Sequence, residues 1–358
     1  MAGTLMTTTA ARPQGGLRVC LYSGAGRLME KSGVGSAMRH QTKMLLALGS
    51  QIVKLWRRPD VVQLNTIFPD SVLVACLARA LGIPVVDFAH STREDFEQSW
   101  VGARSFAPLF EKWLGVVYRR GDVVVTPTPY SRGIIEKYGI EAPIRVLTNG
   151  VDTRFFSGGP AARSRFRMKY GIGADRKVVL SVGHLMVRKG IVEFLDLARR
   201  MPEADFYWAG TAPSEAMMTP DVRAALADLP GNVHLMGHVS PDEVRDAYAG
   251  ADLFCFMSHE ETQGIVVLEA LSSGVPVLVR DIPVYDGWLH EAAVHRATST
   301  AEFEVKARAI LADDAPNLTH AGRLLAAQHD LRAVSYDLAA VHEELLARAG
   351  HRPLPIAA

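Results

Sequence analysis

The sequence predicts an α/β protein made of two doubly wound, Rossmann-like domains that face each other across a cleft. Short apolar runs alternate with helical patterns in both halves of the chain, and this alternation is typical of parallel sheets covered by helices. A glycine-rich, basic stretch at 155–176 separates the halves, and we interpret it as a linker region. The 358 residues, 48% of them hydrophobic, are sufficient for two domains with separate cores.

The N-terminal domain is assigned to residues 17–155. Strands are expected where short apolar runs end in polar turns, and helices where apolar residues recur at helical spacing. In chain order these patterns predict strands at 17–23, 52–55, 61–65, 84–88, 123–126 and 144–147, and helices at 37–48, 71–81, 104–120 and 130–138. Residues 1–16 are polar and lack the apolar segment of a signal peptide, so they are expected to form a disordered tail.

The C-terminal domain is assigned to residues 156–334. Gly274 lies just after one of its expected helices, 264–273, and suits a helix end at which φ is positive. A last amphipathic helix, at about 335–358, is expected to pack back on the N-terminal domain. The same patterns as before predict strands at 178–182, 205–209, 233–236, 252–258 and 275–279, and helices at 191–200, 242–249, 264–273 and 302–312.

The composition gives no sign of several classes of function. Lys and Arg number 39 and Asp and Glu number 38, so the charge does not indicate a nucleic-acid partner. No apolar run approaches the ~20 residues that are needed to cross a bilayer. Cys20, Cys76 and Cys255 lie in apolar segments without metal-binding spacing, and we interpret them as reduced thiols of a cytosolic protein.

Two acidic residues, Glu261 and Glu269, flank the start of helix 264–273, directly after a buried strand. Ligands of parallel sheets bind at this end of the strands. Glu269 lies near the apolar face of the helix, where a carboxylate needs hydrogen-bond donors such as ribose hydroxyls. Glu261 can accept from sugar hydroxyls. The simpler alternatives are a helix-N-terminal acid for Glu261 and an ion pair with a neighbouring helix for Glu269.

The N-terminal half offers two further candidates on the rim of its predicted sheet. Gly33 and Gly35 stand at a helix start, where small residues let backbone amides approach a phosphate. A tight turn without a ligand is the alternative. His90 follows strand 84–88 at its carboxyl end, where it is either a structural histidine or part of the site. Its place on the same rim as the glycines favours function.

The segment 104–120 carries aromatic and aliphatic residues at helical spacing together with four cations. A helix that packs on the core is the simpler explanation. An interfacial helix that contacts anionic lipid is the alternative. The sequence leaves both open.

Over nearly its whole length the chain resembles the GT-B-fold retaining glycosyltransferases of family four. The resemblance rests mainly on a Glu-x7-Glu motif at 261–269, with support from 32–35, 149–152 and 183–190. A narrower resemblance to bacterial diacylglycerol glucosyltransferases rests on 260–269, 280–285 and 88–96.

Transfer of a sugar from a nucleoside diphosphate requires stabilisation of charge on the leaving diphosphate. A divalent metal on an Asp-x-Asp pair is one solution, but no two aspartates are so spaced, and we expect no metal and no cofactor. Fixed cations and helix N-termini are the other solution. Arg188 and Lys189, before the helix that begins near Gly190, fit that role, although a solvated basic pair is the alternative. The family commonly has arginine where His184 stands, and we expect Arg188 to supply that charge.

The resemblance implies a UDP-hexose donor, glucose being expected, and retention of configuration. It places the ribose on Glu269, and the nucleobase near the backbone of His238 and Val239. The residues implied as catalytic are His90, Glu261, Arg188 and Lys189. The residues implied as donor-binding are Gly33, Val34, Gly35, Gly183, His184, His238, Val239, Thr262, Gln263, Gly264, Ile265, Val266 and Glu269.

The narrower resemblance implies a lipid acceptor, diacylglycerol or monoglycosyldiacylglycerol, and a peripheral position on the anionic inner face of the cell membrane. Two alternatives stay open. One is transfer to a water-soluble or polysaccharide acceptor from the same donor site, and the other is a sugar-nucleotide epimerase or a non-catalytic binder. The sequence does not indicate an oligomeric state.

Overall fold

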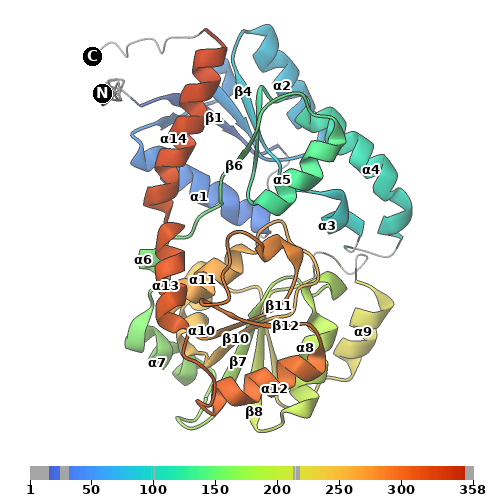
Figure 1. Cartoon of the computed structure of the whole chain (residues 1–358), viewed down its shortest axis with the longest axis vertical. Helices are drawn as coiled ribbons and strands as arrows, with labels where there is room; N and C mark the ends of the chain where they lie inside the picture. The colour runs from blue at the N-terminus through green and yellow to red at the C-terminus, as the bar shows by residue number, and fades with distance from the viewer. Residues whose placement is uncertain are drawn as a thin grey trace, which may run out of the picture.

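The computed structural model of the chain consists of two lobes, each built on one six-stranded parallel sheet (Figure 1). The structure describes residues 16–24, 32–97, 99, 102–212, 214 and 218–350. The expected tail therefore lies outside the described residues except for Gly16, and so do residues 351–358 of the expected last helix. The predicted two-sheet α/β architecture is confirmed.

The N-terminal lobe has the strand order β2-β1-β3-β4-β5-β6. Its central strands are buried on both faces, which explains why they read as continuous apolar runs. The strands are β1 Arg18–Tyr22, β2 Gln51–Ile52, β3 Val61–Leu64, β4 Val85–Phe88, β5 Val123–Thr126 and β6 Ile144–Val146. The helices are α1 Gly33–Ala47, α2 Pro69–Ala80, α3 Arg93–Glu97, α4 Ala103–Tyr118 and α5 Pro129–Ile135, with 3₁₀ turns at Leu55–Arg57 and Glu136–Tyr138.

The C-terminal lobe has the strand order β12-β11-β10-β7-β8-β9. Its strands are β7 Lys177–Val182, β8 Ala204–Ala209, β9 Val233–Gly237, β10 Leu253–Phe256, β11 Val277–Arg280 and β12 His295–Ala297. Its helices are α6 Thr153–Phe156, α7 Gly159–Lys169, α8 Ile191–Arg200, α9 Pro220–Ala227, α10 Pro241–Gly250, α11 Ile265–Ser273, α12 Thr300–Leu311 and α13 Thr319–Gln328, with 3₁₀ turns at Val187–Lys189 and Pro283–Tyr285.

The interpretation of 155–176 as a linker is wrong, because most of this stretch belongs to helices α6 and α7. Phe166 of α7 is buried against the C-terminal lobe. The basic residues that suggested a solvated linker are held in ion pairs instead, Arg163 with Asp252 at 2.8 Å and Arg165 with Asp246 at 2.7 Å. Paired cations of this kind fix the helix to the lobe.

The expected strand 52–55 is also largely wrong. Strand β2 ends at Ile52, and a 3₁₀ turn follows. The reason is geometric, since the chain must return within a few residues to place Val61 beside Val19 in the sheet. Arg58 lies in this turn and has a positive φ of 51°. Helices α3, α9 and α13 are additions that the sequence patterns did not indicate.

The last helix, α14, spans Leu331–Arg348 and returns to the N-terminal lobe, as expected. Figure 1 shows it running along the upper lobe, far from the sheet of the lower one. Leu338 and Leu345 are fully buried in a cluster with residues of β1, β3 and β5. Arg145 of β6 donates two hydrogen bonds to the Glu344 carboxylate, at 2.8 and 2.7 Å. Part of the N-terminal core is therefore made by the end of the chain.

We predict that Leu338→Ala lowers the free energy of unfolding by about 2–5 kcal/mol, because it leaves a cavity in this shared core. Leu324→Ala is the matched control, since Leu324 of α13 is 56% exposed, and we expect it to change stability by less than about 0.5 kcal/mol. Urea unfolding followed by circular dichroism measures both. Equal effects would show that α14 adds nothing to the core.

Candidate active site

The carboxyl ends of the strands in the two lobes border one cleft of about 1410 Å³. Such rims are where open parallel sheets bind ligands. Every residue that the sequence implied as catalytic or donor-binding lines this cleft. The N-terminal lobe contributes Gly33, Val34, Gly35 and His90, and the C-terminal lobe contributes Gly183, His184, Arg188, Lys189, His238, Val239, Glu261, Thr262, Gln263, Gly264, Ile265, Val266 and Glu269.

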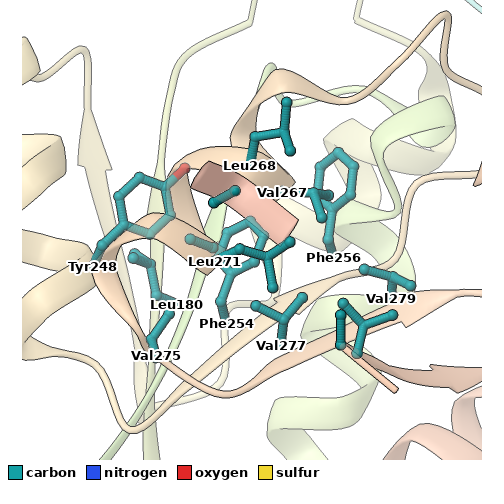
Figure 2. Packing of buried hydrophobic residues seen from close by; sticks show 14 of the residues in the cluster. Leu180, Tyr248, Phe254, Phe256, Val267, Leu268, Leu271, Val275, Val277 and Val279 are labelled. Carbon is teal, nitrogen blue, oxygen red and sulfur yellow. The ribbon is translucent and has the colours of Figure 1, made fainter. Parts of the chain in front are cut away.

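Helix α11 is held at the rim by the core of the C-terminal lobe. Figure 2 shows Val267 and Leu271 of α11 packed near Phe254 of β10, all in one buried cluster. Gly264 precedes the helix with φ 82°, and Gly274 ends it with φ 80°, as predicted for the latter. Both φ values lie in the region that favours glycine. The packing thus fixes the direction in which the helix start faces the cleft.

Glu261 is a buried carboxylate with two strong partners. Its Oε1 lies 2.5 Å from Nζ of Lys189 and accepts a hydrogen bond from Ser258 at 2.7 Å. Burial alone would raise the pKa of Glu261, but the charges of Lys189 and Arg188 outweigh it, and the pKa lies below its usual value. The carboxylate is therefore ionised, and it is more than the exposed helix-N-terminal acid of the simpler alternative.

Glu269 is buried near the start of α11, and its partner is a phenol. Tyr248 of α10, fully buried, donates a hydrogen bond to Oε2 of Glu269 at 2.9 Å. Burial raises the pKa of Glu269 to about 7, although the bond from Tyr248 opposes this shift. The charge of Arg39 on α1 also lowers this pKa, but no ion pair of 4 Å or less joins Glu269 to a cation in the described part of the chain. No pattern in the sequence indicates Tyr248 as a site residue.

Arg188 and Lys189 form a 3₁₀ turn at the end of β7, directly before α8. Gly190 follows with φ 77°, and a β-carbon there would lie 2.3 Å from the carbonyl oxygen of Met257. Arg188 is 8% exposed and donates to the Glu260 carbonyl at 2.8 Å. The alternative of a solvated basic pair is therefore not supported.

The guanidinium of Arg188 also reaches across the cleft. Its Nη1 lies 2.7 Å from Oδ1 of Asp95, which belongs to α3 of the other lobe. Asp95 lines the cleft as well, although the sequence did not single it out as a site residue. Both cations of the turn thus have a carboxylate partner.

Of the histidines that line the cleft, His90 and His184 have lowered pKa values and are neutral. Nε2 of His90 lies 3.0 Å from Oδ1 of Asn65, and burial lowers the pKa of His90 to about 4. Nδ1 of His184 lies 3.0 Å from the Thr211 carbonyl oxygen, and burial together with nearby cations keeps its pKa below the ordinary value. His184 therefore adds no fixed charge at neutral pH, and the positive charge at this position comes from Arg188 and Lys189.

Hydrogen bonds between the lobes surround the site. The amide of Gln263 accepts from the backbone and side chain of Asn149, at 3.0 and 2.8 Å, and donates to Thr148. Thr128 donates to the carbonyl of Thr262 at 2.9 Å. The side chain of Gln263 is thus used to join the lobes, and only its backbone remains available to a ligand in this arrangement.

Family models match both lobes. The Glycosyltransferase Family 4 model matches residues 18–155, and the Glycosyl transferases group 1 model matches residues 162–314. Together with the two facing parallel sheets, these matches define the chain as a GT-B glycosyltransferase, and it belongs to this family. The predicted fold, family and enzyme class are confirmed.

Individual glycosyltransferases are similar to this chain to different extents. The processive diacylglycerol alpha-glucosyltransferase of Acholeplasma laidlawii is 32% identical over 92% of this chain and 99% of its own length. The alpha-monoglucosyldiacylglycerol synthase of Streptococcus pneumoniae is 27% identical over 63% of this chain and 52% of its own. Among solved structures, Anabaena HepE in complex with UDP and glucose superposes with a TM-score of 0.71 at 16% identity, covering 92% of this chain and all of HepE.

The described residues contain no group of three or more His, Cys, Asp or Glu side chains placed to hold a metal ion. No helix among them is long and apolar enough to cross a membrane.

Proposed function

We propose that the chain transfers a hexose, glucose, from a UDP-sugar to a lipid acceptor such as diacylglycerol or monoglycosyldiacylglycerol, with retention and without a metal. The observation that carries this proposal is the cleft arrangement around α11, in which Glu261, paired with Lys189, and Glu269, held from the core by Tyr248, line the cleft between the lobes. The name of the Acholeplasma relative supports the sugar and the acceptor.

In this proposal the diphosphate binds between the lobes. Arg188 and Lys189 approach it from one side, and the amides at the start of α1 from the other. Among the described residues, apart from the chain neighbours of Gly33 and the backbone of its own helix, no atom lies within 4 Å of the position that a β-carbon would take, which supports a ligand at this helix start. Fixed charges and amides of this kind stabilise the leaving group as its charge develops.

The sugar and the ribose are assigned to the two glutamates. Ionised Glu261 accepts hydrogen bonds from hydroxyls of the transferred hexose, and Glu269 accepts from the ribose. The backbone of His238 and Val239 is left for the nucleobase. His90, neutral and held by Asn65, contacts the hexose as a hydrogen-bonding group, because a pKa near 4 does not suit a general base at neutral pH.

Retention is supported by the names of the relatives, which describe alpha-linked products, because UDP-glucose is itself an alpha-linked donor. The bond from the anomeric carbon to the diphosphate oxygen breaks, and the bond to the acceptor oxygen forms on the same face. The acceptor proton passes to the leaving diphosphate. No dedicated base is then required of the protein.

The acceptor approaches along α4. This helix leaves Phe106 55% and Leu109 68% exposed, with Arg104 and Lys112 also on its exposed side. Its opposite side, including Leu114, is buried. The segment thus packs on the core and also presents an apolar, cationic surface, so the two explanations of its sequence are compatible. We propose that this surface contacts anionic lipid.

The test is transfer by the purified chain. UDP-glucose, UDP-galactose and GDP-mannose are each supplied with diacylglycerol vesicles, monoglucosyldiacylglycerol vesicles or water-soluble sugars, with and without EDTA, and product anomers are determined by NMR. We expect an alpha-glucosyl lipid from UDP-glucose, at a rate that EDTA leaves unchanged. A product formed only on water-soluble sugars contradicts the lipid acceptor. A beta-linked product contradicts retention, and loss of activity in EDTA contradicts transfer without a metal.

We predict that the affinity for UDP-glucose rises about tenfold between pH 6 and pH 8, because Glu269, with a pKa of about 7, accepts ribose hydroxyls better when ionised. Calorimetry measures the dissociation constant. Glu269→Gln should bind weakly at both pH values. Tyr248→Phe should move the transition to higher pH, since the bond from Tyr248 lowers this pKa. If the dissociation constant of Glu269→Gln depends on pH as in the wild type, the titrating group is not Glu269.

We predict that Leu109→Glu weakens binding to vesicles containing anionic lipid about tenfold, since it places a charge on the contact surface. Leu324→Glu alters a residue of similar exposure on the other lobe and should bind like wild type. Co-sedimentation measures binding, and transfer to a short-chain, dispersed acceptor shows that the active site is intact. If both variants bind the vesicles equally well, α4 does not contact the membrane.

A further inference from the structure

Asp95 neutralises one of the two cations on which the diphosphate is proposed to bind. Oδ1 of Asp95 lies 2.7 Å from Nη1 of Arg188, and the two side chains are 26% and 9% exposed. Lys189 is paired with Glu261 of its own lobe, whereas the pair of Asp95 and Arg188 joins the two lobes across the cleft. An incoming diphosphate therefore competes with Asp95 for Arg188.

Arg188 is suited to change partners. The Nε atom of its guanidinium is buried without a hydrogen-bond partner, so this side chain is not fully satisfied in the observed arrangement. A guanidinium also binds phosphate oxygens in a forked geometry that a single carboxylate oxygen does not fill. Binding of the diphosphate to Arg188 leaves the Asp95 carboxylate facing the cleft without its cation.

The position of Asp95 associates it with the acceptor side. Short helix α3, which carries it, is fixed to α4 by the stacked rings of Phe96 and Phe110, 4.0 Å apart, and by an ion pair of Arg93 with Glu111 at 2.8 Å. His90 precedes α3 and lines the same cleft. A carboxylate released there needs a new hydrogen-bond donor, and the hydroxyl of an acceptor is such a donor.

We infer that Asp95 is an acceptor-binding residue. Its carboxylate is paired with Arg188 until the donor has bound, and it then holds the acceptor hydroxyl for attack. The inference rests on the proposed function, because it takes a diphosphate as the ligand of Arg188. Asp95 accepts the hydrogen bond of the hydroxyl while the acceptor binds, and in the transfer step this single proton passes from that hydrogen bond to the oxygen of the leaving diphosphate. The donor must then bind before the acceptor.

Asp95→Asn tests the inference, since it keeps the shape of the side chain and removes its charge. Without the competing carboxylate, UDP should bind roughly three- to tenfold more tightly in calorimetry. Transfer to the lipid acceptor should fall about 100-fold in kcat, because the hydroxyl is no longer held. Hydrolysis of UDP-glucose without acceptor should not fall. A purely structural role would weaken all three.

Glu97→Gln is the matched control. It removes a carboxylate from the same helix, where Glu97 pairs with Arg93 at 2.7 Å, but Glu97 does not line the cleft. It should leave UDP binding, hydrolysis and transfer as in wild type. Thermal unfolding of both variants checks that they are folded.

The outcomes separate this inference from the proposed function. If the wild type neither binds UDP nor transfers from UDP-glucose, the proposed function fails. If the wild type does both, the inference is overturned by weaker UDP binding in Asp95→Asn or by unchanged transfer. Parallel loss of hydrolysis and transfer would also overturn it, because Asp95 would then act on the donor.

Discussion

A buried cation must have a counter-charge whenever its ligand is away, and the active site of this glycosyltransferase is arranged around that constraint. Arg188 and Lys189 are almost completely buried at the end of β7, where unpaired charges would cost several kcal/mol. Glu261 and Asp95 supply the missing charge from two different lobes. The charges of these two pairs thus balance, and in the proposed function a diphosphate binds by exchanging places with a carboxylate partner.

The parallel sheets make this exchange possible. Each lobe brings its loops and helix starts to the carboxyl ends of its strands, and the two rims meet at the cleft. The C-terminal rim carries both glutamates and both cations: Glu269 lies on α11, which packs into a buried cluster of this lobe, and Glu261, Arg188 and Lys189 lie in the loop and the 3₁₀ turn nearby. The N-terminal rim contributes α1, His90 and α3. In the proposed function both rims therefore contact the donor, with α1 at the diphosphate and His90 at the hexose, while α3 carries the residue that we assign to the acceptor.

Much of this could be predicted from the sequence because its signals are local. The spacing of Glu261 and Glu269 fixes both residues near one helix start, and Gly190 and Gly274 mark turns that only glycine fits well. Asp95 and Tyr248 could not be found in this way. Their partners lie far away along the chain, and each looks like an ordinary helix residue in its own segment. The helices within 155–176 could not be predicted for the same reason, since the carboxylates that pair with their arginines are distant in the sequence.

The return of α14 to the N-terminal lobe also bears on how the protein is made. Leu331 follows Asp330, which pairs with Val151 at the point where the chain first left that lobe, so both crossings lie side by side. Domains made on the ribosome generally fold in the order of synthesis. Here the N-terminal lobe lacks part of its core until α14 has emerged, whereas the C-terminal lobe, which lies between them in the sequence, has already been synthesised. The N-terminal lobe is thus completed after the C-terminal one, and a stop codon before residue 331 would damage the core of the lobe that was translated earlier.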